Sequence, residues 1–199
     1  RSNDMKFFQH FLPGTPLEEN NHKSLGINLQ RISEYSSFTF VQGLQLDFAK
    51  VELTETQKGA LTTSSAFNNA TRPQGKHYDY EVDSTVIALF AGIEDYILNK
   101  NLNLFADTRA EFIKYDYSNN MISGNTREDG TKCGFGGCYY NRPSDRTDDY
   151  NEISVRIGLK TNYESVNYFA QISLGFRPPQ INEAYRLQKK QNVTDLDSE

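Results

Sequence analysis

The sequence predicts an all-β protein, an incomplete segment of an antiparallel transmembrane β-barrel with about seven strands. Three observations lead to this class. Apolar and polar side chains alternate in runs of about ten residues, which is the period of a strand. These runs are longer than most strands of soluble sheets, and the connections between them alternate between short and long. The longest apolar stretch, residues 86–91, is far too short for a spanning helix.

The clearest hairpin lies towards the C-terminal end. In residues 152–163 the odd positions from Ile153 to Leu159 are apolar, whereas the even positions are polar, charged or glycine. After a short turn at 164–165, residues 166–177 alternate with the opposite parity. Each strand therefore has one apolar face, as half-exposed strands do.

The same alternation predicts the remaining strands. They cover residues 102–112, 38–48, 25–30 and, less regularly, 80–98, with 6–12 as the tail of an earlier strand. Phe105 is an exception, because it is an aromatic residue on the polar face of its run. All of these strands are assigned to a single barrel domain over residues 1–199, and the lack of an initial Met predicts that the chain is an internal fragment.

Connection lengths predict how the strands are oriented. Short turns at 33–37, 99–101 and 164–165 alternate with long polar connections at 13–24, 55–77, 118–149 and 178–198. Outer-membrane barrels have short periplasmic turns and long extracellular loops. The alternation alone also fits a soluble sandwich or a lipocalin-like barrel, but the loop asymmetry and the strand length favour the membrane barrel.

This assignment predicts the environment of each strand face. The aliphatic face meets lipid, and the charged face meets a wet lumen. Lipid contact is predicted for Phe40, Leu44, Leu104, Ile157 and Leu174, and lumen exposure for Gln45, Asp107, Arg109, Arg156 and Gln171.

Composition and motifs argue against several functions. The formal net charge of -5 does not suit a nucleic-acid-binding protein, which needs a basic face. The sequence has no nucleophile elbow, zinc-protease or phosphate-loop motif, so we do not expect an enzyme. The three histidines have no metal-ligand spacing, and the acidic residues 195–199 lack the central glycine of a calcium loop. We therefore expect neither a metal site nor a cofactor.

The stretch Gly175-Phe-Arg-Pro-Pro-Gln-Ile-Asn-Glu-Ala-Tyr-Arg-Leu-Gln188, followed by the acidic residues 195–199, resembles the barrel of TonB-dependent outer-membrane receptors. Pro178 and Ala184 stand where that family usually has Ala and Leu. The segments 133–143 and 77–83 also look like parts of such receptors. The resemblance implies a bacterial outer-membrane location and uptake of a scarce small-molecule nutrient or metal chelate, such as a ferric siderophore. It also implies the TonB complex and outer-membrane lipid as partners.

Two alternatives are a passive porin-type channel and a soluble β-sandwich module that binds a ligand. A plug domain and a TonB box, which the resemblance implies but these residues do not contain, would distinguish a receptor from a porin. Dependence on detergent would distinguish both barrels from a soluble module.

The long loops contain the candidate site residues. Cys133 and Cys138 flank Gly-Phe-Gly-Gly, whose glycines allow a tight turn, and the cell surface is oxidising; a small structural disulfide is predicted. Arginine offers a planar fork to anions, and tyrosine offers a flat surface with a polar tip. Ordinary solvated loop chemistry is the alternative for each residue. Ligand contact is predicted for Tyr139, Tyr140, Arg142, Arg146, Tyr185 and Arg186.

Overall fold

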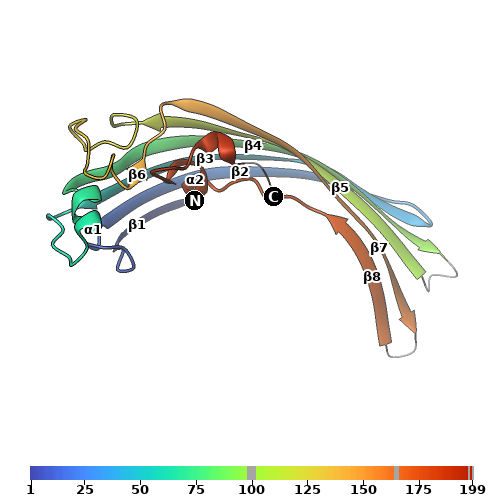
Figure 1. The fold of residues 1–199 in the computed structure, drawn as a ribbon. Coiled ribbons are helices and arrows are strands. Elements are labelled where there is room, and N and C mark those ends of the chain that lie inside the picture. Colours follow the sequence, from blue (N-terminus) through green and yellow to red (C-terminus); the bar gives the residue numbers. More distant parts are fainter. Residues whose placement is uncertain (98–101, 164–165, 197, 199) are drawn as a thin grey trace.

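The computed structural model describes residues 1–97, 102–163, 166–196 and 198, and most of them belong to one curved antiparallel sheet (Figure 1). Seven strands follow each other across this sheet in chain order, which confirms the predicted all-β class and strand number. They are β1 (Ser2–Phe8), β2 (Leu17–Glu34), β3 (Phe38–Gln57), β4 (Gly75–Ile97), β5 (Leu102–Asn119), β7 (Arg146–Tyr163) and β8 (Val166–Leu174).

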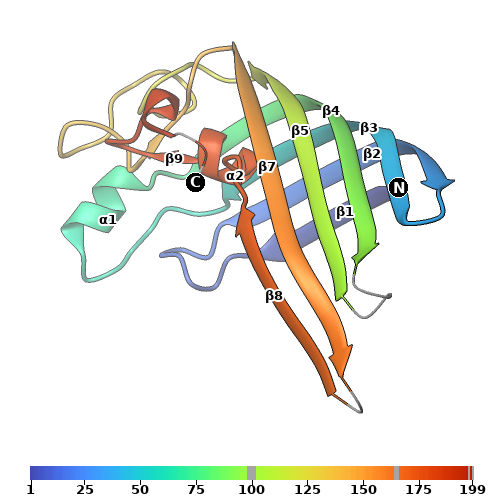
Figure 2. The ribbon, with the colours of Figure 1, turned by 90° about the vertical axis from the view of Figure 1, so that its right-hand side faces the viewer.

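The remaining elements gather at the end of the sheet that has the long connections (Figure 2). A two-stranded sheet joins β6 (Tyr140–Asn141) to β9 (Leu187–Gln188). The helices are α1 (Ala66–Thr71), α2 (Ile181–Tyr185) and a 3-10 turn, η1 (Val193–Asp195). Among the described residues, no helix has the length and hydropathy that a membrane crossing requires.

The strand register separates the two predicted faces. Phe40 lies opposite Ile93, and Leu104 lies opposite Leu159. On the other face Asp107 lies opposite Arg156, with 2.8 Å between its Oδ2 and the arginine Nη2. Because directly opposed residues share a face, the prediction that the aliphatic and polar sets lie on opposite faces is confirmed. The aliphatic face is uncovered within the described residues, and Ile172 is 84% exposed.

The strands extend well beyond the predicted runs, and there the polarity of the faces reverses. On β5 the last outer apolar residue, Phe112, is followed by Ile113, Tyr115 and Tyr117, which alternate onto the inner face and are buried. The outer positions between them carry Lys114 and other polar side chains. Beyond the aliphatic band the inner face therefore becomes the apolar one.

This reversal explains why several predicted boundaries are wrong. Residues 17–24 form the start of β2 rather than a loop, and β1 lies at Ser2–Phe8 rather than at 6–12. The connection between them is the short loop 9–16, in which the Gln9 amide donates to the Pro16 carbonyl at 2.9 Å and Gly14 has a φ of 83°. The polar residues at 18–23 gave no apolar alternation from which a strand could be predicted.

Two inner-face aromatic rings lie over glycines of a neighbouring strand, and one of them is the exception in the alternation. A Cβ at Gly158 would lie 2.4 Å from Cζ of Phe105, and a Cβ at Gly43 would lie 2.3 Å from Cζ of Phe90. Each ring fills the space that its glycine leaves, as aromatic rings do beside strand glycines. Phe105 therefore faces inward because Gly158 makes room for it.

Candidate ligand site at the loop end of the sheet

A cluster of buried tyrosines covers the inner face where the long loops meet the strands. Tyr185 of α2 is fully buried, and its ring stacks on Tyr117 of β5 at 4.4 Å between centroids. The Tyr185 hydroxyl donates to Asp148 Oδ2 at 2.7 Å. Figure 1 shows α2 beneath the arch of the sheet. The cluster holds the segment after β8 against the inner face, and its tyrosines are Tyr78, Tyr80, Tyr115, Tyr117, Tyr140 and Tyr185.

The pairing of β6 with β9 brings the two predicted ligand-contact segments together. Tyr140 lies opposite Gln188, and the Lys189 amide donates to the Tyr139 carbonyl at 2.8 Å. Tyr78 of β4 donates its hydroxyl to the Leu187 carbonyl at 2.7 Å. The loop between β5 and β7 and the segment after β8 are therefore one structural unit above the sheet.

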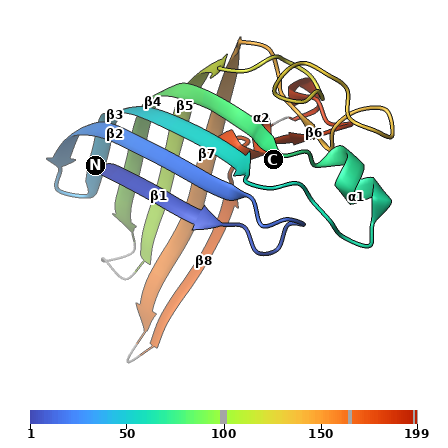
Figure 3. The ribbon, with the colours of Figure 1, turned by 90° about the vertical axis from the view of Figure 1, so that its left-hand side faces the viewer.

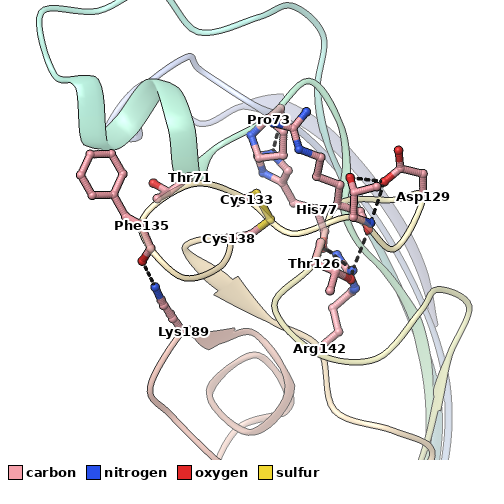
Figure 4. Close-up of a disulfide and its surroundings, with 12 residues drawn as sticks. Thr71, Pro73, His77, Thr126, Asp129, Cys133, Phe135, Cys138, Arg142 and Lys189 are labelled. Atoms are coloured by element: carbon pink, nitrogen blue, oxygen red, sulfur yellow. Dashed lines mark hydrogen bonds between the residues drawn. A yellow bond between two sulfur atoms is a disulfide. The ribbon is translucent and has the colours of Figure 1, made fainter.

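Cys133 and Cys138 form a disulfide at the tip of this unit (Figure 4). Between them Phe135, Gly136 and Gly137 have φ values of 53°, 77° and 128°, so the glycines do allow the predicted tight turn. The turn packs on α1, where the Gly134 amide donates to the Ala70 carbonyl at 3.2 Å. The disulfide thus holds a tight hairpin that braces the helix.

A bulge in β4 turns His77 inward. Glu55 and Thr56 of β3 lie opposite Tyr78 and Lys76, so His77 is the extra residue. Its Nε2 lies 2.8 Å from the Pro73 carbonyl oxygen and its Nδ1 3.0 Å from Glu55 Oε1. The ring also stacks on Tyr140 at 4.5 Å between centroids. The bulge places an imidazole where a regular strand would direct the side chain outward.

Arg186 completes a buried ion network with the same glutamate. One guanidinium nitrogen, Nη1, lies 2.9 Å from Glu18 Oε2, and Nη2 bonds to Glu55 Oε2. Burial raises the pKa of Glu55, but the hydrogen bond from His77 and the charge of Arg186 outweigh it and hold this pKa below its ordinary value. Glu55 lies past the aliphatic band, at the loop end of β3. The network fastens the segment after α2 to β2, β3 and β4.

Arg142 is buried and fastens the long loop by donating to backbone carbonyls. Its Nε bonds to the Ile122 carbonyl at 2.7 Å, and its Nη2 bonds to the Thr126 carbonyl at 2.7 Å. Its Nη1 bonds to the His77 carbonyl at 3.1 Å. All three nitrogens of the guanidinium are used within the fold, as is common for buried arginines.

The six predicted ligand-contact residues come close together, and most of them are already engaged. Tyr140, Arg142 and Tyr185 are buried, and Arg186 is paired with two glutamates. Arg146 forms a double contact with Asp148, with Nε 2.8 Å from Oδ2. Tyr139 is partly exposed, and its hydroxyl donates to Gln188 Oε1 at 3.1 Å. Contact of these residues with a ligand stays a prediction.

Sequence reasoning missed the network of Glu18, Glu55 and His77, since no local pattern marks it. Its members come from three strands, and the bulge that aims His77 has no signature in the sequence. Within the part of the chain that the structure describes, no group of three or more His, Cys, Asp or Glu side chains has the geometry of a metal site.

Comparison with known proteins supports the fold. No protein-family model matches the chain, and no curated protein matches it. A solved structure titled "Copper transporter OprC" matches with a TM-score of 0.59 and 13% sequence identity. The match covers 90% of this chain and 27% of that chain. At this identity the likeness shows the fold alone, which is part of the wall of a large antiparallel barrel.

Proposed function

We propose that this chain is part of an outer-membrane receptor of the TonB-dependent type, which takes up a scarce nutrient such as a ferric siderophore or another metal chelate. The observation that carries the proposal is the two-faced sheet. An uncovered aliphatic band lies on its outer face, and long loops fold inward over its inner face at one end. The transporter title of the structural neighbour also supports a transport role.

The sheet has two open edges, which fit a wall that continues. Within the described residues β1 and β8 each pair with one neighbouring strand, and they lie at opposite edges (Figure 3). Unpaired backbone groups are too costly in hydrocarbon for such an edge to face lipid. The match to only a quarter of its structural neighbour fits a barrel with many more strands.

The inward-folded loops favour a receptor over a passive porin-type channel. The tyrosine cluster and α2 occupy the inner face at the loop end, where a channel would need open water. The uncovered aliphatic face also disfavours the soluble sandwich, which would place these side chains in a closed core. A receptor barrel whose loops fold inward fits both features.

Uptake measurements test the proposal. The full-length protein that contains this chain would be expressed in bacteria that lack their own ferric-chelate and copper receptors, with and without TonB. We expect accumulation of a radiolabelled metal chelate in the TonB-containing cells only. Equal accumulation in both strains would support the porin-type channel, and accumulation in neither strain would contradict the transport proposal.

A further inference from the structure

We propose that Arg72 and Arg127 form a binding pocket for a phosphate group at the loop surface. Both line a cavity of about 460 Å³, whose walls also include Asn69 and Gln74. This pocket lies beside α1 and the disulfide hairpin, apart from the tyrosine cluster. The inference does not depend on which solute the protein transports.

Arg72 is a buried cation with no acidic partner among the described residues. Its side chain is only 7% exposed, and its Nε has no hydrogen-bond partner in the described part of the chain. The structure instead stacks the guanidinium over the Tyr139 ring, 4.2 Å from the centroid. A buried charge of this kind is costly unless a counter-ion completes it. The planar fork of arginine matches an oxyanion such as phosphate.

Several contacts fix the position of Arg72. Its backbone amide donates to the Asn68 carbonyl at 3.0 Å and ends α1, and Pro73 follows at once. The Tyr139 amide donates to the Thr71 carbonyl at 2.9 Å, so the disulfide hairpin holds the Tyr139 ring against the arginine. The guanidinium is therefore preorganised, which reduces the entropy that a ligand would cost on binding.

Arg127 supplies a second positive charge from the opposite loop. Its backbone is held by Arg142, whose Nη2 donates to the Arg127 carbonyl at 3.3 Å, and by the Arg127 amide, which donates to the Thr131 carbonyl at 2.8 Å. The side chain is exposed and forms no hydrogen bond or salt bridge with the described residues. Its charge acts on the exposed Asp129 carboxylate, but no hydrogen bond fixes the side chain, so it can close on an anion that Arg72 holds.

The acidic residues of this loop lie near the pocket, but their carboxylates already accept hydrogen bonds. Glu128 accepts a hydrogen bond from the Lys76 amide at 3.0 Å. Asp129 accepts from the Thr131 amide at 2.9 Å and from its hydroxyl at 2.7 Å. The other two polar side chains of the pocket are also used, since Asn69 bonds to Thr63 and Gln74 to the Lys58 carbonyl. The two guanidiniums are therefore the groups that remain for a ligand.

Inorganic phosphate is the first probe, titrated into the full-length protein in detergent and followed by ³¹P NMR. We expect saturable binding that weakens at least tenfold in Arg72→Gln and in Arg127→Gln. Lys132→Gln is the matched control, since it removes one charge from the same loop outside the pocket, and its affinity should stay within twofold. The phosphate affinity of Arg72→Lys should lie between those of the wild type and Arg72→Gln, because lysine keeps the charge but lacks the planar guanidinium.

A second arm identifies the source of the phosphate. Mixed micelles that contain phosphatidic acid would be compared with micelles of phosphatidylcholine. Arginine-dependent binding that is much tighter for phosphatidic acid than for inorganic phosphate assigns the pocket to a lipid headgroup, and equal affinity assigns it to a soluble phosphate. Because Arg127 is exposed, Arg127→Gln should fold normally. Binding unchanged in that variant, or no saturable binding by the wild type, would overturn the proposal.

Discussion

The two ends of the same strands present opposite patterns. In the aliphatic band Leu44 and Leu89 face outward and Gln45 faces inward, whereas further along the same strands Leu53 and Tyr80 are buried on the inner face. The backbone register continues without a change of parity between these regions. What changes is the surroundings of each face: loops cover the inside of one region, and in our proposal lipid covers the outside of the other. The period sets which side chains share a face, and the surroundings set which face is apolar.

The largest loss of stability is expected from a side-chain truncation in the tyrosine cluster at the loop end. Tyr185→Ala removes a fully buried ring and the stack on Tyr117, and such aromatic truncations cost about 3–5 kcal/mol. We expect the loss to be confined to the segment after β8 and the loops over it. Hydrogen exchange should show lower protection there and unchanged protection in the aliphatic band. Equal loss in both regions would show that they are one cooperative unit.

The next largest effect is expected from a charge on the outer face, which should be costly in the aliphatic band and tolerated beyond it. Leu89→Arg puts a cation in the aliphatic band, where the cost is about 2–4 kcal/mol near the midplane and about 0–1 near the interface. Ser118→Arg is the control, since Ser118 is exposed on the outer face beyond the band and lies opposite Glu81. Urea unfolding in lipid vesicles should show a clear loss for the first variant and little for the second. Equal losses would mean that the band does not define the lipid boundary.

The comparison also explains which parts of the fold the sequence predicted. The aliphatic band was predictable because lipid requires one apolar face. The same face therefore stays apolar along the whole band, and the alternation is regular. Where the band ends on β5, Phe112 faces outward and Ile113 faces inward. Because these two apolar residues are adjacent, the sequence does not reveal that the apolar face changes from the outer to the inner one. The start of β2, Leu17–Ser24, gave no alternation because residues 18–23 are all polar.

The site was predictable only in part. The residues around Cys133, and the segment that contains Tyr185, were singled out from their composition, and the structure joins them through β6 and β9. Arg72 and His77 were missed, because their surroundings depend on a helix end and a bulge. These features follow from tertiary contacts rather than from local sequence.

Removal of the disulfide should have a smaller and local effect. A ring as small as that between Cys133 and Cys138 restricts the unfolded chain little, and a loop-entropy estimate gives about 2 kcal/mol or less. A double replacement by Ser should leave barrel assembly intact and loosen the hairpin that braces α1. Limited proteolysis should detect new cleavage near Phe135. Failure of the barrel to assemble would contradict a purely local role.

Alkaline pH should weaken the loop-end region selectively. Burial raises the pKa of the clustered tyrosines above the ordinary value, and all of them lie beyond the aliphatic band. When the pKa of a tyrosine is higher in the folded than in the unfolded protein, the folded state keeps its full stability below the unfolded pKa of about 10. As pH rises above that value, the stability declines. Tyrosine ionisation followed at 295 nm should lag behind that of the unfolded protein. Coincident curves would mean that the cluster is open to water.

The central claim is that one continuous period-two pattern has lipid on its outer face in the band and water on that face beyond it. Single cysteines along β7 of the full-length protein, from Thr147 to Ile157, would carry a nitroxide for collision measurements in vesicles. We predict that lipid-soluble oxygen reaches Ile153, Val155 and Ile157 but not Ser154 or Arg156, and that a water-soluble nickel complex reaches Thr147. Oxygen access without a period of two, or greatest at Arg156, would contradict the account.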